Sequence, residues 1–340
     1  MAHKVIDLHC DSVSSLMDGK DMRNSVPGVH VDIPRLVKGG VGLQVFAVYV
    51  PANIEKDKAF QFASERLDAI DAFAGSDERV APVENAAEAR SVIAVGKTGI
   101  MASVENGLAI ENSTENLEAL RRRKVRILTL VHSEHLPWVA SCTGTGSFVS
   151  NNGNLSGLSS LGEKVIDAMN DLGIIPDLSH ASEGAFWDVI RRSKKPVIAS
   201  HSCAWNICNA ARNLKDDQLK ALRDTGGLVG VNFFAAFLSE AFRLNFEKDA
   251  KDSANLPPVC VPGIPMSIIA DHIDYMVKLA GEDCVALGSD FDGIPYSPNN
   301  VTGSDFYPLL EVELRSRGYT EKRIGKIFNG NFLRVLEKWD

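Results

Sequence analysis

The sequence predicts a (β/α)₈ barrel, and three observations support this fold. Eight short apolar runs recur along the 340 residues, helical patterns lie between most of them, and most runs are apolar on both alternating faces. Strands with two apolar faces are typical of a parallel sheet that is covered on both sides. Alternation of such strands with helices over this length indicates a barrel, and we expect residues 1–340 to form one domain.

The elements follow from these patterns in chain order. The strands are expected over 4–10, 42–50, 100–105, 125–132, 174–180, 196–202, 228–234 and 284–290. Helical spacing of apolar residues predicts helices over 58–73, 161–172, 216–225, 267–279 and 320–339. Ser160 and Glu163 have capping-box spacing at the second helix, and Gly173 is expected to end it. Residues 142–160 and 256–265 are expected to be loops over the mouth of the barrel.

A doubly wound open sheet is the structural alternative. Its usual mark is a glycine-rich turn after the first strand. Here the first strand ends in His9-Cys10-Asp11, which favours the barrel.

Composition excludes several classes of function. Acidic residues outnumber basic ones by 44 to 36, giving a net charge of −8, so a nucleic-acid partner is not expected. No apolar run has the length of a membrane span, and the N-terminus lacks a signal-peptide core, so we expect a cytoplasmic protein without a membrane partner. The six cysteines include no C-x-x-C pair, which predicts free thiols.

Ionisable side chains gather at the ends of the expected strands. They are His9, Asp11, Glu105, His132, His180, His201 and Asp290. In a barrel the carboxyl ends of the strands meet at one face, so these side chains would share one mouth. Taken singly, each has a structural interpretation, such as a hydrogen-bonded rim histidine, a turn carboxylate or a salt-bridge partner. Strand propensity does not explain the whole set.

The residue types suit divalent metal ions. Histidine and carboxylate ligands fit Zn²⁺ without any thiolate. His9 and Asp11 leave a strand on the same side and can reach one ion, while His180 and His201 on adjacent strands can hold a second. Glu105 can bridge the two, since each of its oxygens can bind one ion. We therefore expect two Zn²⁺ ions.

These motifs resemble the membrane (renal) dipeptidase family, metallopeptidase family M19 of the amidohydrolase superfamily. The matching stretches are DLHCD (7–11), SVENG (103–107), LTLVH (128–132), SLGEKVIDAMNDLGIIPDLSHAS (160–182), PVIASHS (196–202), ARNLKDDQL (211–219) and GSDFDG (288–293). The resemblance covers nearly the whole chain.

The resemblance implies a binuclear zinc site on a barrel. His9, Asp11 and bridging Glu105 would hold one ion, and Glu105, His180 and His201 the other. It also implies that His132 binds substrate near the scissile carbonyl, that Arg212 pairs with the C-terminal carboxylate of a dipeptide, and that Asp290 handles the proton. The implied reaction is attack of a metal-bridging hydroxide on the peptide bond. Tolerance of a C-terminal D-residue and a homodimer are further implications.

Departures from the family pattern leave the substrate side chains open. They lie at His135, Ala140, Phe233–Ala235 and Ser12–Ser14. Two alternatives remain: an amidohydrolase reaction on an N-acyl amino acid, a cyclic amide or a lactone, and a metal-binding homologue without catalysis. Intact Asp290 argues against the second.

Overall fold

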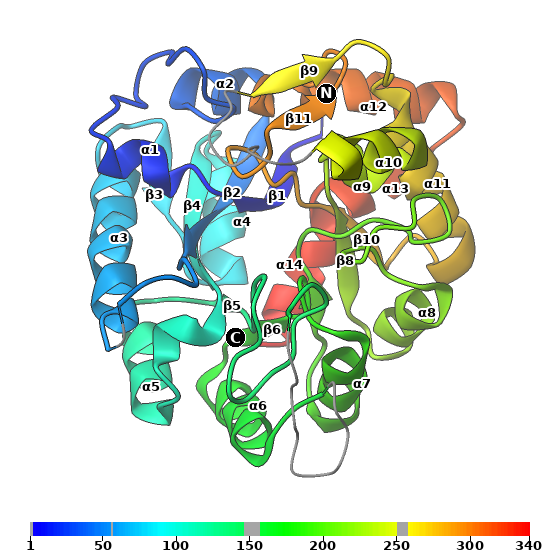
Figure 1. Ribbon diagram of the computed structural model, residues 1–340. Coiled ribbons are helices and arrows are strands. Elements are labelled where there is room, and N and C mark those ends of the chain that lie inside the picture. The colour runs from blue at the N-terminus through cyan, green and yellow to red at the C-terminus, as the bar shows by residue number, and fades with distance from the viewer. Residues whose placement is uncertain (1–2, 56, 146–156, 250–257) are drawn as a thin grey trace.

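Eight parallel strands close into a barrel in the computed structural model, which describes residues 3–55, 57–145, 157–249 and 258–340 (Figure 1). The barrel strands are β1 (Val5–Cys10), β2 (Val41–Tyr49), β4 (Thr98–Glu105), β5 (Ile127–Thr129), β6 (Ile175–Asp177), β7 (Ile198–Ala199), β8 (Leu228–Val231) and β10 (Val285–Leu287). The ring closes because β1 pairs with both β2 and β10, and β2 pairs with β4. The predicted (β/α)₈ barrel is therefore confirmed.

The strands are shorter than most of the predicted apolar runs. The run 196–202 contains only β7, of two residues, and the run 174–180 contains only β6, of three. The chain leaves the sheet before His180 and Asp290, both of which have left-handed backbones, with φ of 68° and 64°. These side chains therefore lie on the first residues of the loops and not on the strands themselves.

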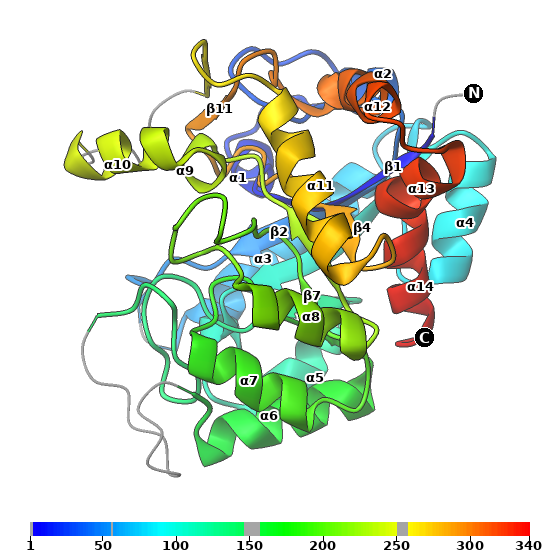
Figure 2. The same cartoon turned by 90° about the vertical axis from the view of Figure 1, so that its right-hand side faces the viewer.

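Fourteen α-helices are described around the barrel, with two short 3-10 helices (Gly107–Ile110 and Ser304–Phe306) (Figure 2). They are α1 (Val13–Met17), α2 (Ile33–Lys38), α3 (Ala59–Ala74), α4 (Ala86–Ala94), α5 (Thr114–Arg122), α6 (Ser160–Leu172), α7 (Glu183–Arg192), α8 (Asp216–Asp224), α9 (Ala235–Leu238), α10 (Glu240–Asp249), α11 (Ser267–Ala280), α12 (Tyr307–Ser316), α13 (Glu321–Gly325) and α14 (Asn331–Glu337). The five predicted helices are present, but the last is divided into α13, a π-helical turn (Lys326–Gly330) and α14.

Two local predictions need correction, and one strand was not predicted. Ser159, not Ser160, is the N-cap of α6, because the Ser159 side chain accepts the Gly162 N–H; Gly173 ends this helix as expected, with φ of 74°. A strand that was not predicted, β3 (Val80–Pro82), pairs with β4 outside the ring. The expected loop 256–265 contains β9 (Val259–Val261), which pairs with β11 (Tyr296–Pro298). Much of the other expected loop, 142–160, lies outside the described residues.

The helix α14 closes the end of the barrel opposite the loops that carry the site. Its apolar residues form one buried cluster with residues of the barrel strands, including Ile6, Leu8, Met101 and Ile175. Arg334 donates to the carbonyls of Gly226 and Asp283, which precede β8 and β10. The N-terminal end of the barrel is thus sealed, and only the carboxyl ends of the strands remain for a site.

All six cysteines are free thiols in the structure. Among the described residues, no helix combines the length and the apolar character needed to cross a bilayer.

A buried histidine ties the outer helices to the loop that follows β7. His272 in α11 is fully buried; its Nδ1 accepts the Ala204 N–H at 3.1 Å, and its Nε2 lies 3.0 Å from the Leu238 carbonyl, which can accept its proton. This arrangement requires the neutral ring. Burial lowers the pKa of His272 to about 4.

Acid should therefore weaken the fold through His272. The unfolded chain protonates this ring below its ordinary pKa of about 6.5, whereas the folded chain does so only near 4, so stability is lost as pH falls between these values. This histidine alone should cost up to about 3 kcal/mol over that window. His272→Gln keeps a donor and an acceptor but does not titrate. Chemical denaturation of both proteins should show their difference in unfolding free energy shrinking towards acid pH; a constant difference would refute the assignment.

Candidate active site

Glu105 lies at the centre of the predicted cluster. It is the last residue of β4 and is buried. Its Oε1 lies 3.0 Å from His180 Nε2 and 3.5 Å from His201 Nε2, and its Oε2 lies 3.6 Å from His9 Nε2. The two carboxylate oxygens therefore face two different groups of nitrogen atoms, as a bridging ligand requires.

The barrel brings together every strand-end residue that the sequence singled out. On one side, His9 Nε2 lies 3.5 Å from Asp11 Oδ2 and 3.9 Å from Asp290 Oδ1. On the other, His180 Nε2 and His201 Nε2 are 3.1 Å apart, and His132 Nε2 lies 4.0 Å from Glu105 Oε1.

The donor set suits divalent cations. His9 Nε2 and Asp11 Oδ1 are buried and have no hydrogen-bond partner among the described residues. Burial lowers the pKa of His180 and of His201 well below the ordinary value, so both rings are neutral and offer lone pairs. Burial alone would raise the pKa of Glu105, but His9 and His180 outweigh it and hold that pKa well below the ordinary value. Burial alone would lower the pKa of His9, but Glu105 and Asp11 outweigh it and raise that pKa well above the ordinary value, so His9 would give up a proton on binding a metal ion. Together with the two neutral imidazoles and the ionised carboxylate, it forms a ligand set for Zn²⁺ or a related ion.

Asp290 is held differently from the other carboxylates. Its Oδ2 accepts a hydrogen bond from Asn232 Nδ2 at 2.8 Å, which leaves Oδ1 facing the centre. Burial, with smaller contributions from Asp11 and Glu105, raises the pKa of Asp290 to about 8. This carboxyl can therefore exchange a proton near neutral pH. Asn232 was not predicted, although it follows β8 as the other site residues follow their strands.

Two further residues border the cluster. The Tyr49 ring, at the end of β2, lies 4.7 Å from the His132 ring, measured between ring centroids; Tyr49 was not predicted, and only its place at a strand end could have indicated it. Arg212 lies in the chain between β7 and α8 and is buried. Its Nη2 donates to the His201 carbonyl at 3.3 Å, and its guanidinium lies over the Phe237 ring.

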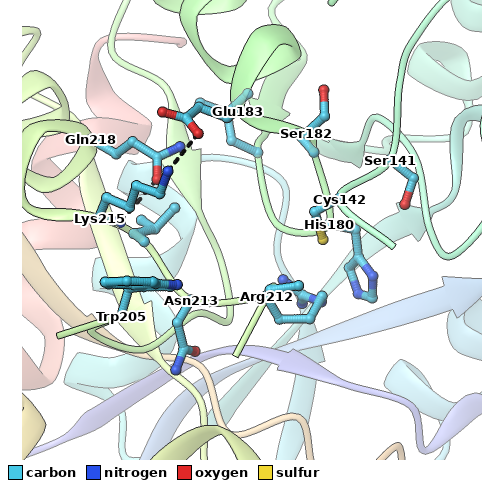
Figure 3. Close-up of a pocket in the computed structure, with 14 residues that line it drawn as sticks. Ser141, Cys142, His180, Ser182, Glu183, Trp205, Arg212, Asn213, Lys215 and Gln218 are labelled. Carbon is cyan, nitrogen blue, oxygen red and sulfur yellow. Dashed lines mark hydrogen bonds and ion pairs between the residues drawn. The ribbon is translucent and has the colours of Figure 1, made fainter. Parts of the chain in front are cut away.

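A pocket of about 230 Å³ opens beside Arg212 and His180 (Figure 3). Most of the lining residues that are labelled in Figure 3 have polar side chains. Lys215 and Glu183 form an ion pair of 2.7 Å across from Arg212, and both are about half exposed. The pocket is therefore lined by one candidate metal ligand, His180, and by a buried cation, Arg212.

The family model described as "Membrane dipeptidase (Peptidase family M19)" matches residues 1–340. The chain belongs to this family. Dipeptidase 3 of Mus musculus is 30% identical over 94% of the chain, and that of Homo sapiens is 29% identical over 95%. The chain spans about three fifths of the length of these two relatives, 59% and 61%.

Solved structures agree with the family over the full chain. A Rhodobacter sphaeroides metallopeptidase, liganded with a phosphinate mimic of the dipeptide L-Ala-D-Ala, is 27% identical with a TM-score of 0.83 over 100% of both chains. A dipeptidase described as a metallopeptidase of family M19 is 28% identical with a TM-score of 0.84 over 99% of both chains. Membership in this metallopeptidase family implies metal ions, and the clustered histidines and carboxylates are the candidate ligands.

Metal binding should stabilise this protein through Glu105. A cation that binds only the folded state raises stability with its concentration, and saturating Zn²⁺ should raise the melting temperature by roughly 5 °C or more. Glu105→Gln should remove most of this shift. Differential scanning fluorimetry after chelation and after metal addition measures it.

His3 provides the matched control. It forms a second cluster with Glu311 and Glu321, but Arg315 pairs with both carboxylates there. His3→Gln should keep the full metal-dependent shift. Equal shifts in Glu105→Gln and wild type would contradict the ligand assignment.

Proposed function

We propose that this protein is a zinc-dependent dipeptidase that hydrolyses dipeptides and accepts a D-residue at the C-terminal position. The observation that carries the proposal is Arg212, a buried guanidinium beside a pocket that reaches His180. A dipeptidase must recognise a free carboxylate next to the scissile bond, and arginine binds carboxylates with two parallel hydrogen bonds. The L-Ala-D-Ala mimic in the Rhodobacter sphaeroides structure supports the D-residue.

Five residues would hold two zinc ions. They are His9, Asp11 and Glu105 for one ion, and Glu105, His180 and His201 for the other. When bound, such ions lower the pKa of a water molecule and polarise a carbonyl.

Asp290 would move the proton. Asn232 fixes Oδ2, so Oδ1 takes the proton from the attacking water and delivers it to the leaving amine. Both transfers suit a group whose pKa lies near neutrality. His132 would donate to the carbonyl oxygen as it gains negative charge, because its Nε2 faces the Glu105 side of the centre.

The pocket would take the side chain of the C-terminal residue. Its fixed charges are Arg212, Lys215 and Glu183, and the substrate carboxylate would neutralise Arg212. The remaining Lys215–Glu183 pair has no net charge, which favours neutral and polar side chains over charged ones. A homodimer and a cytoplasmic location stay predictions of the sequence.

Removal of Arg212 should separate a dipeptidase from the alternatives. Arg212→Ala should raise KM for L-Ala-L-Ala and L-Ala-D-Ala by about 100-fold, because a charge-assisted pair is lost. A C-terminally amidated dipeptide should be a poor substrate of both proteins, with a much smaller change. Steady-state hydrolysis of this panel with Zn²⁺ measures the effect.

Failure of metal-loaded wild type to cleave any dipeptide would sink the proposal. Cleavage of an uncharged lactone or cyclic amide that is unaffected by Arg212→Ala would instead favour another amidohydrolase reaction. Cleavage of N-acyl amino acids with dependence on Arg212 would keep the carboxylate contact but change the substrate class.

Charge at the far side of the pocket should set side-chain preference. Glu183→Gln leaves Lys215 unpaired and should raise the kcat/KM ratio of L-Ala-L-Glu to L-Ala-L-Lys by about threefold to tenfold; Lys215→Gln should lower it similarly. Arg192→Gln, at a surface pair with Asp167, is the control and should leave the ratio unchanged. An unchanged ratio in both pocket variants would exclude this placement of the side chain.

A further inference from the structure

Asp177 is a buried carboxylate that no step above uses. It is the last residue of β6 and is 0% exposed. Its Oδ1 accepts the backbone N–H groups of Ser179 and Ser200 at 3.0 and 2.8 Å. Its Oδ2 accepts the hydroxyls of Thr129 and Ser200, both at 2.5 Å. All four donors are neutral, so this carboxylate holds the backbone just before two of the candidate metal ligands.

The Ser200 hydroxyl, which donates to Asp177, also contacts the ring of His201. Ser200 Oγ lies 2.7 Å from His201 Nδ1. The Ser200 hydroxyl has one proton and gives it to the Asp177 carboxylate at 2.5 Å rather than to Ser179 Oγ at 3.3 Å, so towards His201 it can only accept. His201 Nδ1 must therefore carry the ring proton. The other nitrogen, Nε2, is left with a lone pair that faces Glu105 and His180.

We propose that Asp177 is a positioning residue which, through Ser200, fixes the tautomer of His201 in which Nε2 can bind a metal ion. The relay replaces the direct carboxylate–histidine contact that commonly orients metal-binding histidines. The inference rests on the proposed metal site but is independent of the substrate.

The chain offers a matched pair on the other side of the centre. Asp7 is also 0% exposed and accepts the N–H and the hydroxyl of Ser289, at 2.8 and 2.6 Å. Ser289 directly precedes Asp290, as Ser200 precedes His201. The Ser289 hydroxyl touches no candidate ligand ring: it donates to Asp7, lies 3.2 Å from the backbone carbonyl of His9, and accepts the Phe291 N–H at 3.1 Å. Both serine-to-alanine substitutions remove one buried hydroxyl that donates to an aspartate. Only the Ser200 hydroxyl also contacts the ring of a candidate ligand.

The test compares Ser200→Ala with Ser289→Ala. Zn²⁺ affinity, measured by competition with a chromogenic chelator, should fall by about 10-fold to 100-fold in Ser200→Ala. Ser289→Ala should stay within about threefold of wild type, and Ser200→Thr, which keeps the hydroxyl, should restore the affinity. Equal losses in both alanine variants, or no loss in Ser200→Ala, would overturn the proposal. Wild type without zinc affinity would instead refute the metal site itself.

Nitrogen NMR of the metal-free protein reads the tautomer directly. The His201 ring, assigned by its absence in His201→Gln, should carry its proton on Nδ1 in wild type. In Asp177→Asn the side-chain amide can donate to Ser200, whose hydroxyl then turns its proton to His201 Nδ1. The ring proton should therefore move to Nε2, and zinc affinity should fall. A ring that keeps its proton on Nδ1 in Asp177→Asn would exclude the relay, and Ser200→Ala remains as the test if that variant does not fold.

Discussion

Closure of the strand ring is the constraint on which the site depends. The pairing of β1 with β2 and β10, and of β2 with β4, forces the carboxyl ends of eight parallel strands to surround one volume. Side chains that are far apart in sequence, such as His9 and Asp290, are within 3.9 Å because β1 pairs with β10. An open sheet would spread the same residues along an edge, and Glu105 could not face both groups of histidines.

Such convergence is electrostatically expensive. Asp11, Glu105 and Asp290 approach one another where water is largely excluded, and burial raises the pKa of Asp11 and of Asp290. The structure meets this cost with histidines, which supply positive charge or lone pairs, and with fixed neutral donors such as Asn232. Metal ions are the natural remaining compensation, since they attract the carboxylates and use the lone pairs together. The same crowding of carboxylates and lone pairs that costs free energy also makes the set suited to a metal ion.

Buried polar groups next to the candidate ligands fix the backbone conformation, and so the direction, of two site side chains. His180 and Asp290 both have left-handed backbones, which non-glycine residues seldom adopt. The residue before each one donates its backbone N–H to a buried aspartate, Asp177 for Ser179 and Asp7 for Ser289. These buried contacts hold the unfavourable conformations, and they turn the two side chains into the centre. Arg212 lies beside this assembly, in the same connection between β7 and α8 that carries His201, and its hydrogen bond to the His201 carbonyl fixes the guanidinium relative to that candidate ligand.

The amino-acid pattern was enough to predict the number and order of the barrel strands, four helices nearly to the residue, and the seven ionisable groups at the strand ends. It could do so because apolar periodicity and the residue after each strand are local properties. It misplaced the N-cap of α6 by one residue and missed β3, whose pairing with β4 lies outside the ring. The folded chain was needed to show which nitrogen faces which oxygen, that Asn232 and Tyr49 border the centre, and that Asp177 reaches His201 through Ser200. Those facts depend on distances across neighbouring strands and on backbone conformation, and both arise only when the ring closes.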